Sequence, residues 1–419
     1  MIKKVLVFIM DGLGDRPISE FGNKTPLEYA NTPNFDKLCS ESQCGLMYTL
    51  GRGKRPGSDT AHLSIFGYPI DEYYTGRGPI EAAGVGIELS NGDIAFRGNF
   101  GTVDENWNVI DRRAGRISDV TPFAQAIDGM EIDGIRFVVK PGSAYRAGVV
   151  MRGEGLSSKV SNADSHNAFD KVQEVVPLDN SNEAKFTANV LNKFMKKTYD
   201  ILNELVENKK LEKEGKYKAN FLLLRGAGVF PKLPKFTEKW GFENACCIAG
   251  GGLYKGVGAF LGMKLINVDG ANAQINTNIE GKMRAAVEAL KTNDFVFLHI
   301  KPTDSLAEDG NFVGKRDFIE KIDKYVPILN EVDDETLIVI TADHSTACEL
   351  KAHSADPVPI LFHCKGIRSD GITKFGERSC AKGSLGVIEG KDVMPNILNI
   401  MGKLPLTGSW NGIFPFFID

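Results

Sequence analysis

Residues 337–344 read Leu-Ile-Val-Ile-Thr-Ala-Asp-His, a short apolar run that ends in two polar side chains. Similar apolar runs of strand length occupy residues 5–10, 295–300 and 358–362. Continuous apolar strands that alternate with helical patterns are typical of a parallel sheet covered on both faces. The sequence therefore predicts an α/β fold, with a mostly parallel sheet sandwiched between helices.

Acidic side chains follow three of these predicted strands. Asp11 comes directly after the first, Asp304 lies four residues past Ile300, and Asp343 is followed by His344. In open α/β sheets, ligands bind at the carboxyl ends of the strands. We therefore expect these distant residues to meet at one edge of one sheet.

The middle of the chain has a different pattern. Alternating stretches at 136–140 and 145–151 predict strands of a hairpin, and a helical pattern runs from about Glu183 to Lys213. A chain of 419 residues suits two domains. We predict a discontinuous metal-binding core domain at 1–90 and 243–419, and an inserted smaller α/β substrate-binding domain at 91–242.

Composition excludes several classes of partner. The net charge of -4 provides no basic field for nucleic acid, and no apolar run approaches the roughly 18 residues that span a bilayer. The seven cysteines contain no CxxC pair, which suits a reducing compartment. We expect a cytoplasmic monomer or small homo-oligomer that acts on a small molecule, without nucleic acid or membrane partners.

The segment Pro56-Gly57-Ser58-Asp59-Thr60-Ala61-His62 places a serine at the start of a predicted helix. Free amides and the helix dipole favour negative charge there, including a phosphoryl group or an alkoxide. A plain helix cap is the alternative interpretation of Ser58. The segment thus offers a nucleophile but does not establish one.

Possible metal ligands gather near the predicted strand ends. Asp343, His344 and His353 offer the oxygen and imidazole ligands of Zn²⁺ or Mn²⁺. Asp304 and Glu308 share one helix face, although an acidic solvated loop is the alternative. A serine attacks a phosphate ester only when its hydroxyl becomes anionic, which two metals about 4 Å apart achieve. The pattern predicts metal-dependent phosphoryl transfer.

Several segments together resemble the archaeal-type cofactor-independent phosphoglycerate mutases of the alkaline phosphatase superfamily, over nearly the whole length. They are Asp11-Gly12, Lys24-Thr25-Pro26-Leu27-Glu28, Thr32-Pro33-Asn34, residues 56–62, Tyr74-Thr75-Gly76-Arg77-Gly78-Pro79, residues 111–116, Leu224-Arg225-Gly226-Ala227-Gly228, Asp343-His344 and His353-Ser354-Ala355-Asp356-Pro357.

The resemblance implies a fold like that of alkaline phosphatase and a site for two divalent metals. One ion would be held by Asp11, Ser58, Asp343 and His344, and the other by Asp304 and His353. The family usually has histidine at the position of Glu308, and a carboxylate there favours harder metals. We expect Mn²⁺, with Zn²⁺, Co²⁺ or Mg²⁺ as alternatives, and no requirement for 2,3-bisphosphoglycerate.

The implied reaction interconverts 3-phosphoglycerate and 2-phosphoglycerate through a phosphoserine on Ser58, as in glycolysis and gluconeogenesis. The resemblance also implies that either Asp164 or Asp111 is the base for the glycerate hydroxyl. The implied substrate-binding residues are Arg112, Arg116, His166, Arg225 and Lys255.

The same core motifs fit other outcomes. A related phosphatase would let water take the phosphoryl group, and a small-molecule phosphotransferase resembling homoserine kinase would pass it to another hydroxyl. A protein that keeps the fold but only binds ligands is a further alternative, indicated by Glu308 alone.

Overall fold

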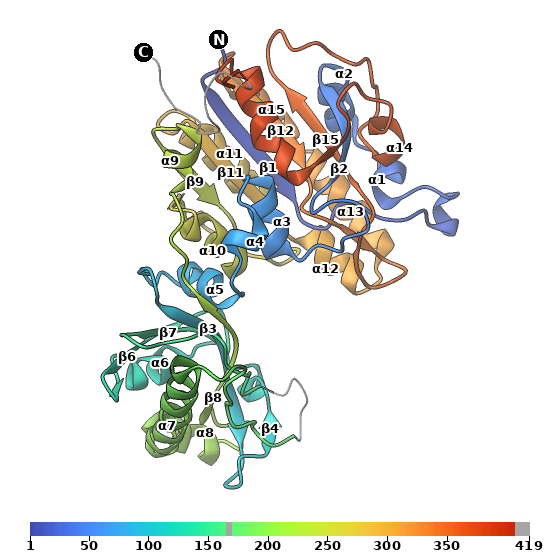
Figure 1. Cartoon of the computed structure of the whole chain (residues 1–419). Helices are drawn as coiled ribbons and strands as arrows, with labels where there is room; N and C mark the ends of the chain where they lie inside the picture. The colour runs from blue at the N-terminus through green and yellow to red at the C-terminus, as the bar shows by residue number, and fades with distance from the viewer. Residues whose placement is uncertain (165–169, 407–419) are drawn as a thin grey trace. The chain divides into compact units, whose positions relative to one another are not determined.

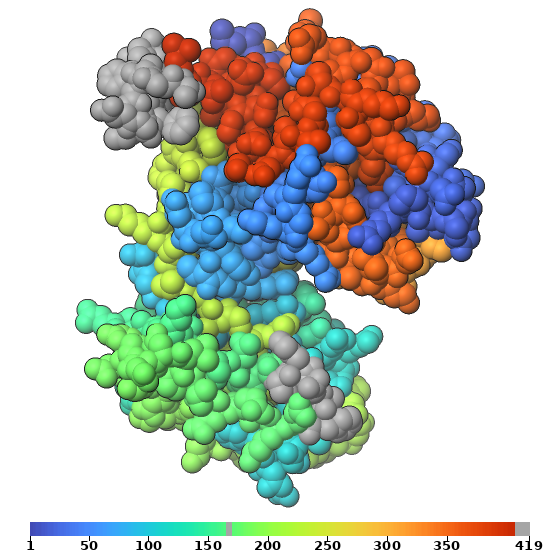
Figure 2. Space-filling view, turned by 45° about the vertical axis from the view of Figure 1, so that its right-hand side comes forward, coloured from blue at the N-terminus to red at the C-terminus, as the bar shows by residue number. Residues whose placement is uncertain are grey.

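The computed structural model describes residues 1–164 and 170–406, and the chain forms two compact units. The core unit comprises Met1–Glu72 and Pro234–Asp419, and the inserted unit comprises Tyr73–Leu233. Figure 2 shows blue N-terminal and orange to red C-terminal residues side by side, as expected where both ends of the chain build one unit. The predicted position of His166 lies outside the described residues.

Both boundaries of the inserted unit differ from the predicted 91–242. Helix α5 (Gly78–Gly84) packs on strands β3 (Ile94–Val103), β7 (Arg146–Arg152) and β8 (Phe221–Val229) of the inserted unit. Gly78 permits this contact because a Cβ there would lie 2.0 Å from the Ala95 carbonyl oxygen. At the other boundary, the Trp240 indole donates to the Phe66 carbonyl (2.9 Å) and so joins the core unit.

The core unit contains a sheet in the order β10-β9-β11-β1-β12-β15-β2-β16. Its strands are β10 (Lys264–Leu265), β9 (Ala245–Ile248), β11 (Phe295–Ile300), β1 (Lys4–Met10), β12 (Thr336–Thr341), β15 (Val358–His363), β2 (Gln43–Tyr48) and β16 (Gly386–Glu389). The first five are parallel, and β16 is parallel to β2. The predicted mostly parallel α/β sheet is confirmed.

Strand β15 is the exception, because it runs antiparallel to both β12 and β2. The chain between β12 and β15 forms a short hairpin of β13 (Ser345–Ala347) and β14 (Ala352–Ser354). A parallel neighbour needs a longer crossover connection, usually a helix, and this segment has none. His353 lies in this hairpin. The change of chain direction between β12 and β15 therefore also brings His353 back toward the edge of the core sheet.

Helices surround the core sheet, as Figure 1 shows. Those of the core unit are α1 (Pro26–Tyr29), α2 (Pro33–Ser40), α3 (Ser58–Ile65), α4 (Ile70–Tyr73), α9 (Phe236–Trp240), α10 (Gly252–Phe260), α11 (Ile279–Ala289), α12 (Pro302–Glu308), α13 (Phe312–Asp323), α14 (Glu377–Cys380) and α15 (Val393–Ile400). Across residues 1–164 and 170–406, no helix combines the length and apolar character that crossing a bilayer requires.

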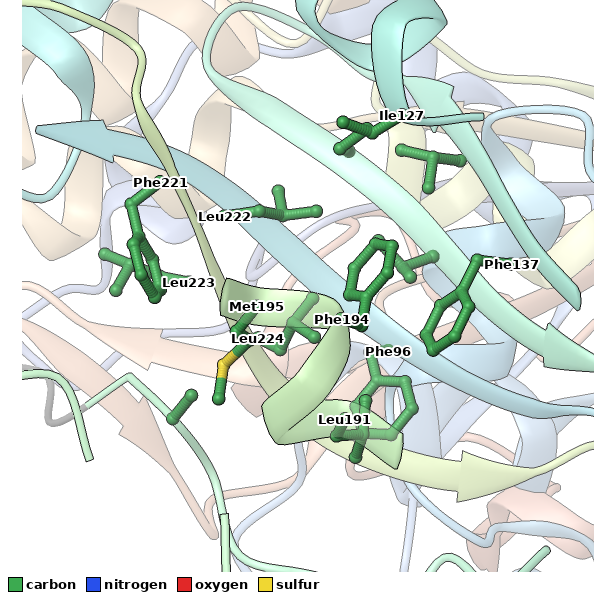
Figure 3. Close-up of a cluster of buried hydrophobic side chains, with 14 of the residues drawn as sticks. Phe96, Ile127, Phe137, Leu191, Phe194, Met195, Phe221, Leu222, Leu223 and Leu224 are labelled. Carbon is green, nitrogen blue, oxygen red and sulfur yellow. The ribbon is translucent and has the colours of Figure 1, made fainter. Parts of the chain in front are cut away.

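The inserted unit has an antiparallel sheet in the order β4-β3-β7-β6-β5, with β8 also paired to β3. The strands not yet given are β4 (Val109–Asp111), β5 (Glu131–Ile132) and β6 (Ile135–Pro141). Figure 3 shows its apolar core, where the Phe137 and Phe194 rings stack with centroids 3.9 Å apart. The predicted hairpin is the β6–β7 pair.

The long helix predicted from Glu183 to Lys213 is in fact two helices. Helix α7 (Asn182–Glu204) ends at Leu205, whose extended backbone (φ -63°, ψ 134°) separates it from α8 (Val206–Lys213). The buried Asn208 amide donates to the Leu202 and Ala219 carbonyls across the break. The prediction of one continuous helix was wrong. Apolar spacing does not reveal a side chain that hydrogen-bonds to the backbone groups left unpaired where a helix ends. Helix α6 (Thr121–Ile127) completes the helices of this unit.

Candidate metal centre

The three parallel strands β11, β1 and β12 end side by side. Met10 pairs with Ile300, and Ile9 pairs with Thr341, so the polar residues that follow emerge at one edge. The Asp11 amide continues the ladder by donating to the Ile300 carbonyl (2.9 Å). The expected convergence of the strand-end residues within the core unit is therefore observed.

The His344 Nε2 atom lies among three oxygen atoms. Its distances are 3.1 Å to Ser58 Oγ, 3.3 Å to Asp343 Oδ2 and 3.4 Å to Asp11 Oδ1. All four side chains are buried. These groups, which we call the first donor set, are the ones expected to share one ion.

The neighbouring hydroxyl of Thr346 orients the His344 ring. Thr346 donates to Asp304 Oδ1 (2.7 Å), so its oxygen is left to accept from His344 Nδ1 (3.1 Å). A neutral imidazole with its proton on Nδ1 presents a lone pair at Nε2. The nitrogen that faces the first donor set is thus the one able to ligate a metal.

Two buried carboxylate oxygens support this interpretation. Asp11 Oδ1 and Asp343 Oδ2 have no hydrogen-bond partner within the described residues. A buried carboxylate oxygen without a partner is unfavourable, whereas a divalent cation with oxygen and imidazole ligands would satisfy both atoms. The donor set therefore fits a metal ion.

A second donor set lies beside the first. His353 Nε2 is 3.5 Å from Asp304 Oδ1 and 3.9 Å from Glu308 Oε1. The other ring nitrogen, Nδ1, pairs with the Pro56 carbonyl (2.8 Å), which again leaves Nε2 free to ligate. The His344 and His353 rings stack with centroids 3.6 Å apart, so the two sets adjoin. Glu308 lies near this set with 52% of its side chain exposed.

Ser58 is the first residue of α3, and Gly57 is its N-cap residue. The amides of this first turn and the helix dipole favour negative charge at the serine. Ser58 is buried, and its hydroxyl contacts His344 rather than its own helix backbone. The contact favours a role in the donor set over a plain helix cap.

The electrostatics of the site depend mainly on Lys301. Burial raises the pKa of Asp11 and of Asp343; repulsion from Asp304 adds to the effect at Asp11, and repulsion from Asp11 adds to it at Asp343. Burial would also raise the pKa of Asp304, but the Lys301 ammonium 2.7 Å away brings it to about 2. Lys301 Nζ is 3.5 Å from Asp11 as well, so one cation contacts both donor sets.

The residues around these sets that sequence reasoning missed include Lys301, Tyr254, Thr346 and His62. Tyr254 donates to Asp11, and His62 lies with Nδ1 3.7 Å from Asp343 Oδ2. Lys301 follows β11 directly, so the strand-end rule was sufficient to find it; the other three carry no such signal.

In the inserted unit, Asp164 forms a two-pronged ion pair with Arg112, at 3.0 Å to Nε and 2.6 Å to Nη2. Arg225 Nε lies 3.7 Å from the same buried carboxylate. Asp111 instead accepts from the amides of Arg113 and Gly115 and stabilises its own turn. The structure thus brings Asp164, Arg112 and Arg225 together and leaves Asp111 apart.

More arginines lie around this group than the sequence indicated. Glu81 pairs with Arg77 (2.9 Å) and Arg97 (3.4 Å). Burial, followed by repulsion from Arg225, Arg146 and Arg77, lowers the pKa of Arg97 to about 10. Guanidinium groups crowded together in this way form a setting for a carboxylate or phosphate.

Two predicted substrate residues lie outside this arginine group. Arg116 is exposed, with a left-handed backbone (φ 60°). Lys255 belongs to the core unit, on α10, where its ammonium donates to Asn267 Oδ1 (2.8 Å). Among the described residues, no hydrogen bond or ion pair joins the Arg116 side chain to the arginine group.

Comparisons with known proteins identify the family of the chain. The metalloenzyme superfamily model matches residues 3–400. The chain is 50% identical over 404 residues to the 2,3-bisphosphoglycerate-independent phosphoglycerate mutase 1 of Methanocaldococcus jannaschii, covering 96% of this chain and 98% of that protein. The corresponding enzyme of Archaeoglobus fulgidus is 45% identical, with coverages of 95% and 99%.

Solved structures give the same result. The cofactor-independent phosphoglycerate mutase of Thermoplasma acidophilum matches with a TM-score of 0.73 and 35% identity, covering 95% of this chain and 100% of that one. A protein from Pyrococcus horikoshii matches with a TM-score of 0.83 and 38% identity, with coverages of 98% and 100%. The chain belongs to the 2,3-bisphosphoglycerate-independent phosphoglycerate mutases, within the metalloenzyme superfamily.

Proposed function

We propose that the chain interconverts 3-phosphoglycerate and 2-phosphoglycerate through a phosphoserine on Ser58. The observation that carries the proposal is the burial of the Ser58 hydroxyl at the start of α3, 3.1 Å from His344 Nε2 and beside a buried carboxylate pair. Ser58 Oγ would take the phosphoryl group from one glycerate hydroxyl. The other hydroxyl would then take it back, so no water enters the reaction.

We propose two divalent cations, one at each donor set. Asp11, Ser58, Asp343 and His344 would hold one, and Asp304 and His353 the other. Bound there, the cations would make the serine hydroxyl more acidic and neutralise phosphoryl oxygens. Glu308 beside His353 adds an oxygen ligand, which favours Mn²⁺ over the softer Zn²⁺.

The chain's own residues supply the remaining requirements. The amides of the first turn of α3 favour the charge that develops at Ser58. The Lys301 ammonium balances the carboxylates of Asp11 and Asp304. The crowded arginines of the inserted unit suit the carboxylate and phosphate groups of a phosphoglycerate. Between the two proposed bases, we favour Asp164, because its carboxylate lies beside Arg112 and Arg225 in the arginine group, whereas Asp111 stabilises its own turn.

Phosphorus NMR tests the proposal directly. Purified protein is incubated with 3-phosphoglycerate and Mn²⁺, and the phosphorus resonances are followed over time. We expect 2-phosphoglycerate to accumulate to equilibrium without free phosphate. Free phosphate without 2-phosphoglycerate would show that the protein is a phosphatase and not a mutase. An unchanged spectrum would show that it only binds ligands.

A further inference from the structure

Three buried thiols meet in the core unit, within a group of residues that the proposed reaction does not use. Cys39 lies in α2, Cys44 in β2, and Cys380 is the last residue of α14. Their sulfur atoms all lie within 4.8 Å of one another, and each residue is 0% exposed. We call this group the thiol cluster.

The backbone around the cluster is closely packed. The Leu385 amide donates to the Cys44 carbonyl (3.1 Å), so the segment after α14 lies directly on β2. A Cβ at Gly383 would lie 2.1 Å from the same carbonyl oxygen, which only glycine avoids. The packing therefore holds Cys380 against Cys44, although they are far apart in the sequence.

The orientation of the sulfurs exceeds what apolar packing requires. Cysteines used as small hydrophobes need not point at each other, yet the sulfurs of Cys39 and Cys44 are 3.2 Å apart. The other four cysteines of the chain join no comparable group in the described residues.

We propose that Cys39, Cys44 and Cys380 bind a thiophilic cation of the Zn²⁺ or Cu⁺ class, separately from the catalytic centre. Thiolates select such soft ions over Mn²⁺ and Mg²⁺. Binding exchanges three S–H protons for three sulfur–metal bonds, with release of three protons and no change in oxidation state. The carboxylate of Asp370, which accepts from the Cys44 amide (2.6 Å), lies beside the cluster.

The location separates this site from the proposed catalysis. Thr49 directly follows β2 and donates to the Asp343 carbonyl. It lies five residues beyond Cys44, which corresponds to about 16 Å at the rise of a strand. A cation on the thiol cluster would join α2, β2 and α14. Because it binds only the folded arrangement, it would stabilise the core unit rather than take part in phosphoryl transfer.

Spectroscopy with Co²⁺ tests the proposal. The full chain is reduced, freed of metal with a chelator and titrated with Co²⁺. The catalytic donor sets contain only oxygen and nitrogen, so sulfur-to-cobalt charge-transfer absorption in the near ultraviolet reports the thiol cluster alone. We expect this band to report one bound Co²⁺ per chain in addition to any Co²⁺ at the catalytic donor sets, and a parallel Cu⁺ titration against a competing chelator to show one tight site.

Matched variants assign the signal. Cys380→Ala is expected to lose the band and one equivalent of Co²⁺, whereas Cys364→Ala, at a buried cysteine outside the cluster, keeps both. Circular dichroism verifies folding, and Cys39→Ala replaces any variant that fails to fold. The absence of both the band and a tight Cu⁺ site in the reduced wild-type chain would overturn the proposal, as would a band unchanged by Cys380→Ala.

Discussion

Ser58 combines three properties that rarely coincide in a structural serine. It is buried, it begins a helix, and its hydroxyl contacts the imidazole of His344 instead of a backbone amide. Each property by itself suits an ordinary helix start. Together they place a hydroxyl where charge is stabilised and water is excluded.

Replacement of this hydroxyl is the first test at the residue scale. We expect Ser58→Ala to reduce mutase turnover by at least about 10⁴-fold, as the loss of a covalent nucleophile does. Its unfolding free energy should change by less than about 1 kcal/mol, because only one oxygen is removed. Coupled-enzyme kinetics and urea unfolding measure the two effects. Substantial remaining activity would show that Ser58 is not the nucleophile.

Lys282 is a second residue with a measurable consequence. It is 0% exposed, and burial, followed by repulsion from Lys255, lowers its pKa to about 8 from an ordinary 10.5. The unfolded chain therefore binds more protons between these values, so this residue's contribution to stability rises with pH there. Below pH 8 the buried charge destabilises the fold by up to about 3 kcal/mol.

We accordingly expect the unfolding free energy of Lys282→Met, relative to that of the wild type, to fall as pH rises from 8 toward 10.5. Urea unfolding at several pH values measures the difference. Lys291→Met, at a side chain that is 66% exposed, serves as the matched control and should show no such trend. A pH-independent difference for Lys282→Met would contradict the assignment.

At the scale of elements, α12 places Asp304 and Glu308 one turn apart on the same helix. His353 approaches both from β14, at 3.5 and 3.9 Å. Partial desolvation of Glu308, followed by the nearby Asp304 charge, raises the Glu308 pKa, as expected for a carboxylate close to another negative charge. The helix thus supports the proposed second metal position.

We expect Glu308→Gln to raise the Mn²⁺ concentration for half-maximal activity about tenfold, because a neutral amide is the weaker ligand. Glu308→His should recover part of the affinity and shift preference toward Zn²⁺. Activity titrations with each metal measure both effects, and the exposed neighbour Asp309→Asn is the control. If Glu308→Gln titrates like the wild type, Glu308 is not a ligand.

Helix α2 illustrates a cap supplied from another element. Thr32 occupies the N-cap position, but its side chain makes no capping bond. The Asp323 carboxylate, at the end of α13, accepts from the amides of Asn34 (3.3 Å) and Phe35 (2.8 Å) instead. A long-range contact therefore satisfies the helix start.

This arrangement predicts unequal effects of two substitutions. Asp323→Ala should lower the unfolding free energy by about 2 kcal/mol, since it leaves buried amides without an acceptor. Thr32→Val, which keeps the volume and removes only the hydroxyl, should change it by less than about 0.5 kcal/mol. Urea unfolding measures the loss of unfolding free energy for each variant. Equal losses would show that the Thr32 hydroxyl caps the helix after all.

At the scale of the whole molecule, every proposed metal ligand belongs to the core unit, whereas the arginine group belongs to the inserted unit. A ligand stabilises only the part of the chain whose folded form binds it. Metal binding should therefore act unequally on the two units.

Removal of metal with a chelator tests this division. We expect faster amide hydrogen exchange in residues 1–72 and 234–406, by about tenfold or more near the strand ends, and little change in 73–164 and 170–233. Mass spectrometry of exchanged peptides locates the change. Equal acceleration in both units would show that the bound metals stabilise the inserted unit as well.

The sequence by itself determined four strands of the core sheet, one hairpin of the inserted unit, the polar residues at three strand ends and the serine at a helix start. Apolar runs and turn residues are local signals, and the strand-end rule needs no coordinates to bring Asp11, Asp304 and Asp343 together. The Glu308 position next to Asp304 on one helix face also follows from spacing alone.

Only the tertiary structure decided which side chains face each other. The protonated nitrogen of His344, the contacts of Lys301, the unit boundaries and the thiol cluster each depend on residues far apart in the chain. Hydrogen bonds and ion pairs require atoms within about 3 to 4 Å, a precision that packing of distant elements sets and that no local pattern encodes.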